Sequence, residues 1–201
     1  MLRSILVLGC AAISASLSMA GEFNKVLTVG DKAPSWENLD GTDGKKHSLA
    51  DLKDKAVVVV VFTCNSCPSA AAYESRLIPF AAEHAGPDAK VAVVAINVNL
   101  IKEDSLPEMT KRAVKKKYPY PYLFDPSQEI AKKFGAKYTP EFFVLDKDRN
   151  VVYMGAMDEK NPPAEAGTNF LKAAVLAALA GKAPEKTETL GRGCMIGFSL
   201  Q

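Results

Sequence analysis

The segment Ala56 to Phe62, with five consecutive valines followed by a phenylalanine, constrains the fold more than any other stretch of this sequence. Side chains alternate between the two faces of a strand, so an uninterrupted apolar run indicates a strand that is buried on both faces. Such a strand lies at the centre of a sheet that helices cover on each side. The chain has 201 residues and 48% hydrophobic content, which is enough for one domain with a substantial core.

Apolar spacing elsewhere alternates between helical and strand patterns. The predicted helices span residues 70–84, 105–117, 125–134 and 168–180, and the predicted strands span residues 56–62, 91–98, 122–124, 141–146 and 150–154. A helix between the first two strands makes that pair parallel, and the turn residues 146–149 make the last two strands a hairpin. Residues 29–52 are expected to hold only short strands or a hairpin. The order predicts an α/β fold with a mixed central β-sheet flanked by helices on both faces.

Residues 1–20 have the pattern of an export signal, with Arg3, a mostly apolar stretch and small residues that end at Ala20. An alternative is a lipoprotein signal, in which Cys10 would become the lipidated first residue. Either interpretation predicts an exported, periplasmic or secreted protein, where disulfides can persist. We therefore expect a signal peptide over 1–20, a folded domain over 21–183 and a C-terminal tail over 184–201 that carries Cys194.

The charge balance argues against several classes of partner. With 25 Lys and Arg against 23 Asp and Glu, the net charge is +2, which creates no strong field toward nucleic acid or an anionic membrane. A basic cluster within residues 111–117 is interpreted as a solvated helix face, since cations are favourable near a helix C-terminus. No segment after the signal is apolar enough to predict a membrane span. The sequence leaves the oligomeric state open.

Two cysteines, Cys64 and Cys67, follow directly after the valine-rich strand. A structural disulfide between them would close a very short loop and contribute little stability. A zinc site needs three or four ligands, and the chain has only His47 and His84 besides its cysteines, so we expect no metal and no cofactor. Redox chemistry fits best, because a helix N-terminus stabilises a thiolate, and Cys64 is the expected attacking sulfur with Cys67 as its resolving partner. Pro68 leaves open which of the two cysteines caps the helix.

The motifs around these cysteines resemble the thioredoxin-like superfamily. Cys64-Asn65-Ser66-Cys67 and Tyr138-Thr139-Pro140 are similar to its active site and cis-proline loop, and residues 30–34 and 47–52 are similar to its redoxin branch of alkyl hydroperoxide reductases and thiol-specific antioxidants. Residues 62–68, 120–125, 139–143 and 193–196 resemble a peroxiredoxin-like group with a Cys-x-x-Cys active site. The resemblance implies a thioredoxin-like fold, Cys64 as nucleophile, Cys67 as resolving thiol and a cis peptide bond before Pro140. It also implies that the backbone of Thr139 pairs with an extended substrate peptide.

Cys194 is the remaining thiol of the exported chain. Three roles stay open for it: a resolving thiol that folds back toward Cys64, an intermolecular disulfide, or a passive buried thiol. Glu74 and Glu141 are the acids expected closest to the cysteine pair. Each is interpreted either as a proton shuttle for Cys67 or as an ordinary surface carboxylate.

The favoured function is thiol-disulfide exchange, with protein disulfides or thiols as partners and a protein electron donor. One alternative is a thiol peroxidase that reduces hydroperoxides. A full peroxidatic motif would need proline at position 60 and a hydroxyl at position 64 to serve Cys67, and this chain has Val60 and Cys64 there. Another alternative is a metal- or haem-handling chaperone that uses the same sulfurs as soft ligands.

Overall fold

The computed structural model describes residues 21–86, 88–159 and 168–199. The expected signal peptide, with Cys10, lies outside the described residues, so both interpretations of it stay predictions. Within the described part of the chain, no helix is long and apolar enough to cross a membrane.

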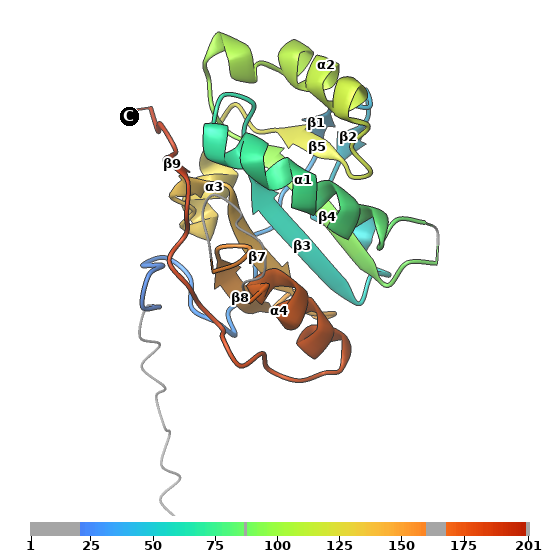
Figure 1. The fold of residues 1–201 in the computed structure, drawn as a ribbon, viewed down its shortest axis with the longest axis vertical. Coiled ribbons are helices and arrows are strands. Elements are labelled where there is room, and N and C mark those ends of the chain that lie inside the picture. The colour runs from blue at the N-terminus through green and yellow to red at the C-terminus, as the bar shows by residue number, and fades with distance from the viewer. Residues whose placement is uncertain (1–20, 87, 160–167, 200–201) are drawn as a thin grey trace, which may run out of the picture.

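A seven-stranded sheet forms the centre of the molecule (Figure 1). Its spatial order is β2-β1-β5-β4-β3-β7-β8. The strands are β1 (Leu39–Gly41), β2 (Lys46–His47), β3 (Val57–Phe62), β4 (Val91–Asn97), β5 (Tyr122–Phe124), β7 (Glu141–Leu145) and β8 (Val151–Gly155). Parallel pairing joins β3 to β4 and β4 to β5, whereas β3–β7 and β7–β8 are antiparallel. The sheet is therefore mixed, as the sequence predicts.

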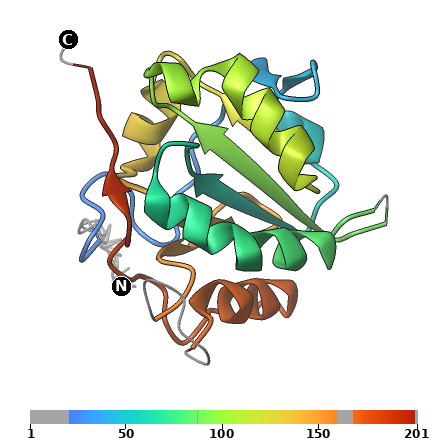
Figure 2. The same cartoon turned by 45° about the horizontal axis from the view of Figure 1, so that its top comes forward.

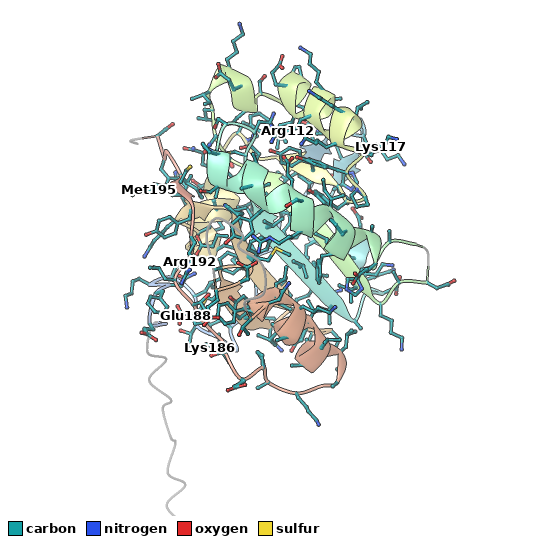
Figure 3. All side chains as sticks on the ribbon, viewed as in Figure 1. Arg112, Lys117, Lys186, Glu188, Arg192 and Met195 are labelled. Carbon is teal, nitrogen blue, oxygen red and sulfur yellow. The ribbon has the colours of Figure 1, made fainter. Side chains whose placement is uncertain are left out.

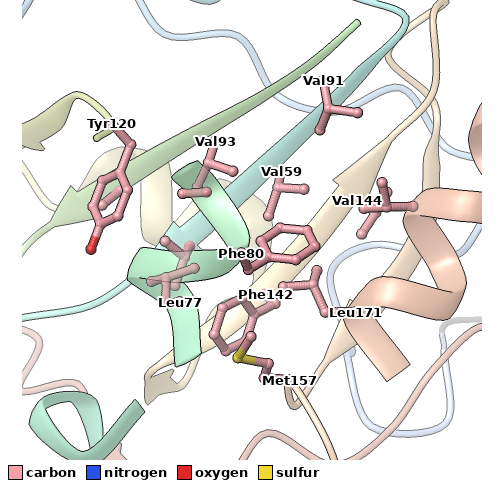
Figure 4. Close-up of a cluster of buried hydrophobic side chains, with 14 of the residues drawn as sticks. Val59, Leu77, Phe80, Val91, Val93, Tyr120, Phe142, Val144, Met157 and Leu171 are labelled. Carbon is pink, nitrogen blue, oxygen red and sulfur yellow. The ribbon is translucent and has the colours of Figure 1, made fainter. Parts of the chain in front are cut away.

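The valine-rich strand β3 lies near the middle of this sheet, and all six of its residues are fully buried. Alternate residues of the strand face two separate hydrophobic clusters. Val57, Val59 and Val61 belong to one cluster, and Val58, Val60 and Phe62 belong to the other. Figure 4 shows part of the first cluster, in which Val59 and Val144 of the sheet meet Phe80 and other helical side chains. The apolar run thus fills both halves of the core, as its uninterrupted pattern indicates.

Helices cover both faces of the sheet. The helices are α1 (Pro68–Ala82), α2 (Leu106–Lys116), α3 (Glu129–Phe134) and α4 (Phe170–Leu179), with short 3-10 turns at η1 (Leu49–Leu52) and η2 (Lys102–Asp104). Buried side chains of α1, α2 and α4 pack in the first cluster, and those of α3 and η1 pack in the second. The expected layers are confirmed. Ser105 is the N-cap of α2 but makes no side-chain capping hydrogen bond, because its hydroxyl donates to the Lys102 carbonyl.

A second, two-stranded sheet lies beside the first and joins β6 (Tyr138–Thr139) to β9 (Cys194–Met195). The chain reaches β9 through residues that are already attached to the domain. The Met154 amide in β8 donates to the Thr187 carbonyl, and the Thr189 amide donates to the Met154 carbonyl. The Glu188 carboxylate accepts from three backbone amides of residues 22–24. In Figure 2 the C-terminal strand runs past the beginning of α1. This arrangement brings the tail to the cysteine pair.

Candidate active site

The loop between β3 and α1 presents both cysteines at the N-terminus of a long helix. Cys67 is the N-cap: its backbone is extended, and its Sγ accepts a hydrogen bond from the Ala70 amide at 3.4 Å. Pro68 follows as the first helical residue, where its missing amide costs nothing. The question that the sequence left open is thus answered, because Cys67 rather than Cys64 occupies the cap.

Both sulfurs of the pair lie against the loop that contains Pro140. The Thr139–Pro140 peptide bond is cis, as the resemblance implied. Cys64 Sγ lies 3.5 Å from the hydroxyl oxygen of Thr139, and Cys67 Sγ lies 2.9 Å from the carbonyl oxygen of the same residue. The structure therefore brings together four of the predicted site residues, which are Cys64, Cys67, Thr139 and Pro140.

Cys194 is the fifth predicted site residue at this centre. Its Sγ lies 2.7 Å from Cys67 Sγ, so the tail thiol does fold back to the site. The contact is made with Cys67, whereas the sequence interpretation placed it toward Cys64. Cys64 and Cys67 are almost completely buried, at 4% and 3% exposed, and Cys194 is half-buried.

The negative charge of the pair belongs on Cys67. A hydrogen bond from the Cys64 thiol, aided by the Cys194 thiol, Thr139 and the Ala70 amide, lowers the pKa of Cys67 from near 9 to about 4, although burial opposes the shift. The same hydrogen bond to Cys67, together with burial, raises the pKa of Cys64. These contacts favour the thiolate on Cys67, whereas the sequence analysis expected it on Cys64, and the assignment of the attacking sulfur stays a prediction. Helix-terminal amides point at the cap residue, and the cap is Cys67.

Asp104, which the sequence analysis missed, holds the loop between the two cysteines. This fully buried carboxylate accepts from the backbone amides of Asn65 and Ser66 at 2.6 and 2.9 Å and from the Ser66 hydroxyl at 2.6 Å. The Asn99 side chain donates to it as well, at 3.1 Å. In sequence, Asp104 belongs to a polar stretch that resembles any surface loop. The one sequence feature that could have pointed to it as a site residue is its place shortly after β4, the strand beside β3.

The two acids that were considered as proton shuttles have other contacts. Glu74 forms ion pairs with Arg112 at 2.6 Å and Lys116 at 3.1 Å, and it accepts a hydrogen bond from Tyr118. Arg112, labelled in Figure 3, also donates to the Asn65 carbonyl, which links this ion pair to the active-site loop. These contacts fit a supporting role for Glu74.

Glu141 supports the other side of the site. Its carboxylate accepts from the backbone amides of Lys137 and Tyr138 at 2.6 and 2.9 Å, and it thereby braces the start of β6. Burial raises the pKa of Glu141 despite these two hydrogen bonds. Among the described residues there is no group of three or more His, Cys, Asp or Glu side chains arranged to hold a metal ion.

A scan against protein-family models matches residues 28–169 to Redoxin. The chain belongs to the Redoxin family. Among curated proteins it is similar to the thiol-disulfide oxidoreductase ResA of Bacillus thuringiensis subsp. konkukian (strain 97-27), with 29% identity over 74% of this chain and 82% of that one. The family and this relative together identify the protein as an oxidoreductase.

Solved structures share the fold of this chain. The protein SMc02350 of Sinorhizobium meliloti 1021 is 34% identical, covers 89% of this chain and 98% of its own, and superposes with a TM-score of 0.81. Peroxidoxin BcpB of Mycobacterium tuberculosis is 22% identical over 77% of this chain and 97% of its own, with a TM-score of 0.57, and this likeness concerns the fold alone. The fold is thioredoxin-like, with the mixed sheet and flanking helices that the sequence predicts.

Proposed function

We propose that this redoxin is an extracytoplasmic thiol-disulfide oxidoreductase that exchanges disulfides with protein partners through Cys64 and Cys67. The observation that carries the proposal is the position of both sulfurs at the N-terminus of α1, against Thr139, whose peptide bond to Pro140 is cis. The likeness to a thiol-disulfide oxidoreductase supports the reaction type. The signal-like residues 1–20 support the compartment.

In the reducing direction, the thiolate of the pair attacks one sulfur of a partner disulfide. The partner's S–S bond breaks, its other sulfur leaves as a thiolate, and a new S–S bond joins enzyme and partner. The second cysteine of the pair then attacks the enzyme sulfur of this mixed disulfide and gives up its proton, and the partner's second sulfur leaves. Two electrons and one proton pass to the partner, which ends as one thiol and one thiolate, and Cys64 and Cys67 end as a disulfide that a protein electron donor reduces again.

Residues around the pair have defined parts in this exchange. The Ala70 amide and the neighbouring thiol stabilise the thiolate on Cys67. Asp104 keeps the loop between the cysteines in place through its amide contacts. The backbone of Thr139 offers an edge on which an extended partner segment pairs beside the sulfurs.

The proposal is tested with Cys64→Ser and Cys67→Ser variants in a background where Cys10 is serine. The parent protein, kept reduced by dithiothreitol, should reduce insulin disulfides, and either substitution should abolish this activity. The variant that keeps the attacking thiol should also accumulate a mixed disulfide with a peptide activated as its nitrothiobenzoate disulfide. Accumulation in Cys67→Ser would assign the first attack to Cys64, as the resemblance implies, and accumulation in Cys64→Ser would assign it to Cys67, where the charge lies.

A control assay separates this function from peroxide reduction. The same protein is mixed with hydrogen peroxide under stopped flow, and thiol oxidation is followed directly. Slow oxidation together with insulin turnover supports the proposal. Rapid oxidation by hydrogen peroxide without insulin turnover would overturn it in favour of a thiol peroxidase.

A further inference from the structure

The tail strand β9 occupies the edge that the proposed function assigns to a partner. It runs antiparallel to β6, with Cys194 opposite Thr139 and Met195 opposite Tyr138. The Ile196 amide extends the pairing by donating to the Lys137 carbonyl at 2.9 Å. Figure 3 labels Arg192, which precedes the strand in the chain, and Met195, which is its second residue. The tail thus uses the backbone groups that an extended substrate would use.

Close packing at two glycines shows how tightly the tail fits this edge. A Cβ at Gly193 would overlap the Thr139 carbonyl oxygen, and a Cβ at Gly191 would come within 2.7 Å of the Tyr138 ring. Real Cβ atoms do not make such contacts, so any larger residue at Gly193 must push the strand away. Gly197, only three residues after Cys194, has open space where its own Cβ would lie. Glycine directly before the cysteine is therefore a requirement of the docked strand.

The docked tail also occupies the space in front of the active-site sulfurs. Cys194 packs against the small cluster formed by Cys64, Cys67 and Ala70, and both cysteines of the pair are less than 5% exposed in its presence. A partner disulfide needs direct access to the attacking sulfur. Such access requires β9 to leave. Residues 187–189 have their own contacts with β8 and the N-terminal segment, so they can stay in place when β9 leaves.

From this geometry we propose that the C-terminal strand is an internal substrate: it occupies the partner edge, and Cys194 exchanges onto Cys67. This inference rests on the proposed function and names its substrate class. External partners are extended segments in which glycine directly precedes the reactive cysteine, because they pair with Thr139 in the register of Gly193 and Cys194.

The internal step is a thiol-disulfide exchange that needs no oxidant of its own. Reduction of a partner leaves Cys64 and Cys67 joined. Cys194, as its thiolate, attacks Cys67 Sγ; the Cys64–Cys67 bond breaks, a Cys67–Cys194 bond forms, and Cys64 leaves as a thiolate that takes the proton lost by Cys194. One disulfide is broken and one is formed, so the step conserves electrons.

Disulfide mapping tests the internal exchange. The protein with serine at position 10 is equilibrated with oxidised dithiothreitol, quenched in acid, alkylated and digested, and its linked peptides are identified by mass spectrometry. We expect a Cys67–Cys194 link beside Cys64–Cys67. The Cys64→Ser variant should form the Cys67–Cys194 link, whereas Cys67→Ser should not form a Cys64–Cys194 link, because the tail thiol contacts Cys67.

Kinetics with a matched pair of glycine variants test the occupied edge. The substrate is the disulfide-joined dimer of a peptide with the sequence of residues 190–198. Gly193→Ala should lower the KM for this substrate, by about tenfold if the parent tail is docked nine-tenths of the time. Gly197→Ala should leave the KM unchanged, because its new Cβ meets no atom. The same peptide with alanine in place of its glycine before cysteine should be the poorer substrate for both proteins.

The outcomes separate this inference from the proposed function. Parent protein that reduces insulin but yields only the Cys64–Cys67 link, together with a Cys64→Ser variant that yields no Cys67–Cys194 link, would overturn the internal exchange alone. An unchanged or higher KM in Gly193→Ala, or equal use of the glycine and alanine peptides, would overturn the occupied edge. Far-ultraviolet circular dichroism and the melting temperature check that both glycine variants are folded. Absence of insulin reduction by the parent protein would instead remove the proposed function itself.

Discussion

Replacing Asp104 should loosen the loop between the active-site cysteines and lower the stability of the whole domain. In the Asp104→Ala variant, the amides of Asn65 and Ser66 and the Ser66 hydroxyl all lose their acceptor. The Asp104 side chain is fully buried, so bulk water does not reach its carboxylate in the folded protein. The loss therefore leaves three partly buried donors without their acceptor.

The size of the effect follows from those contacts. Hydrogen bonds to charged groups contribute about 1.5–3 kcal/mol each, so three from the loop give an upper bound of roughly 4.5–9 kcal/mol. The loop donors are only partly buried and can turn toward water, and removal of the buried charge relieves its desolvation. We expect a loss of about 2–4 kcal/mol in the free energy of unfolding for Asp104→Ala. Asp104→Asn keeps the shape and one acceptor, and it should lose about half as much.

Urea unfolding of the reduced protein measures this prediction. Both variants should shift the transition midpoint without changing the dependence of the free energy on urea, since the buried surface is unchanged. Insulin reduction by Asp104→Ala should fall as well, because the loop that separates the two sulfurs is no longer held. A loss below about 0.5 kcal/mol for Asp104→Ala would refute the assignment of Asp104 as the anchor of the loop.

Three further predictions concern the core, a helix end and pH. Phe62→Ala removes a fully buried ring that packs edge-on against Phe134, and it should lower the free energy of unfolding in urea by about 3–5 kcal/mol. An unchanged free energy of unfolding would refute the core role of Phe62. Gly135→Ala places a Cβ against the Asn24 side chain at a φ of 66° and should lower the melting temperature, whereas the open Gly44→Ala should lower it less. The pKa of Cys67 is near 9 in the unfolded chain and about 4 in the folded one, so its contribution to stability is complete above pH 9 and is lost as the pH falls toward 4. The free energy of unfolding of the reduced protein should therefore rise with pH between about 5 and 8 more steeply than that of Cys67→Ser. Equal slopes would contradict this prediction.

Hydrophobic pattern was sufficient to predict most of the architecture. The run before Cys64 indicated a doubly buried strand, and β3 is that strand. Its parallel pairing with β4 and the β7–β8 hairpin also followed from the spacing of apolar segments and turn residues. These features depend on burial, which a sequence displays directly.

Details of the site depend on contacts that a local pattern does not display. The motif placed two cysteines near a helix start, but the φ and ψ of Cys67 decide which one becomes the cap and receives the amide hydrogen bond. Asp104 has no motif, because its role depends on a loop from a neighbouring strand. The tail strand β9 has only two residues and no periodicity, and its docking depends on the absence of a side chain at Gly193. The cis bond before Pro140 was implied by family resemblance alone.

The central claim is that hydrogen bonds from the Cys64 thiol and from the Ala70 amide at the beginning of α1 hold the active-site charge on Cys67, and thiolate absorbance measures it most directly. The reduced protein with serine at position 10 is titrated from about pH 3 to about pH 10, together with its Cys64→Ser and Cys67→Ser variants. The account predicts one thiolate per chain that forms well below pH 7, is lost in Cys67→Ser and persists in Cys64→Ser, where the serine hydroxyl replaces the thiol as the donor. A first thiolate that forms only near pH 9, or one that survives in Cys67→Ser, would contradict it.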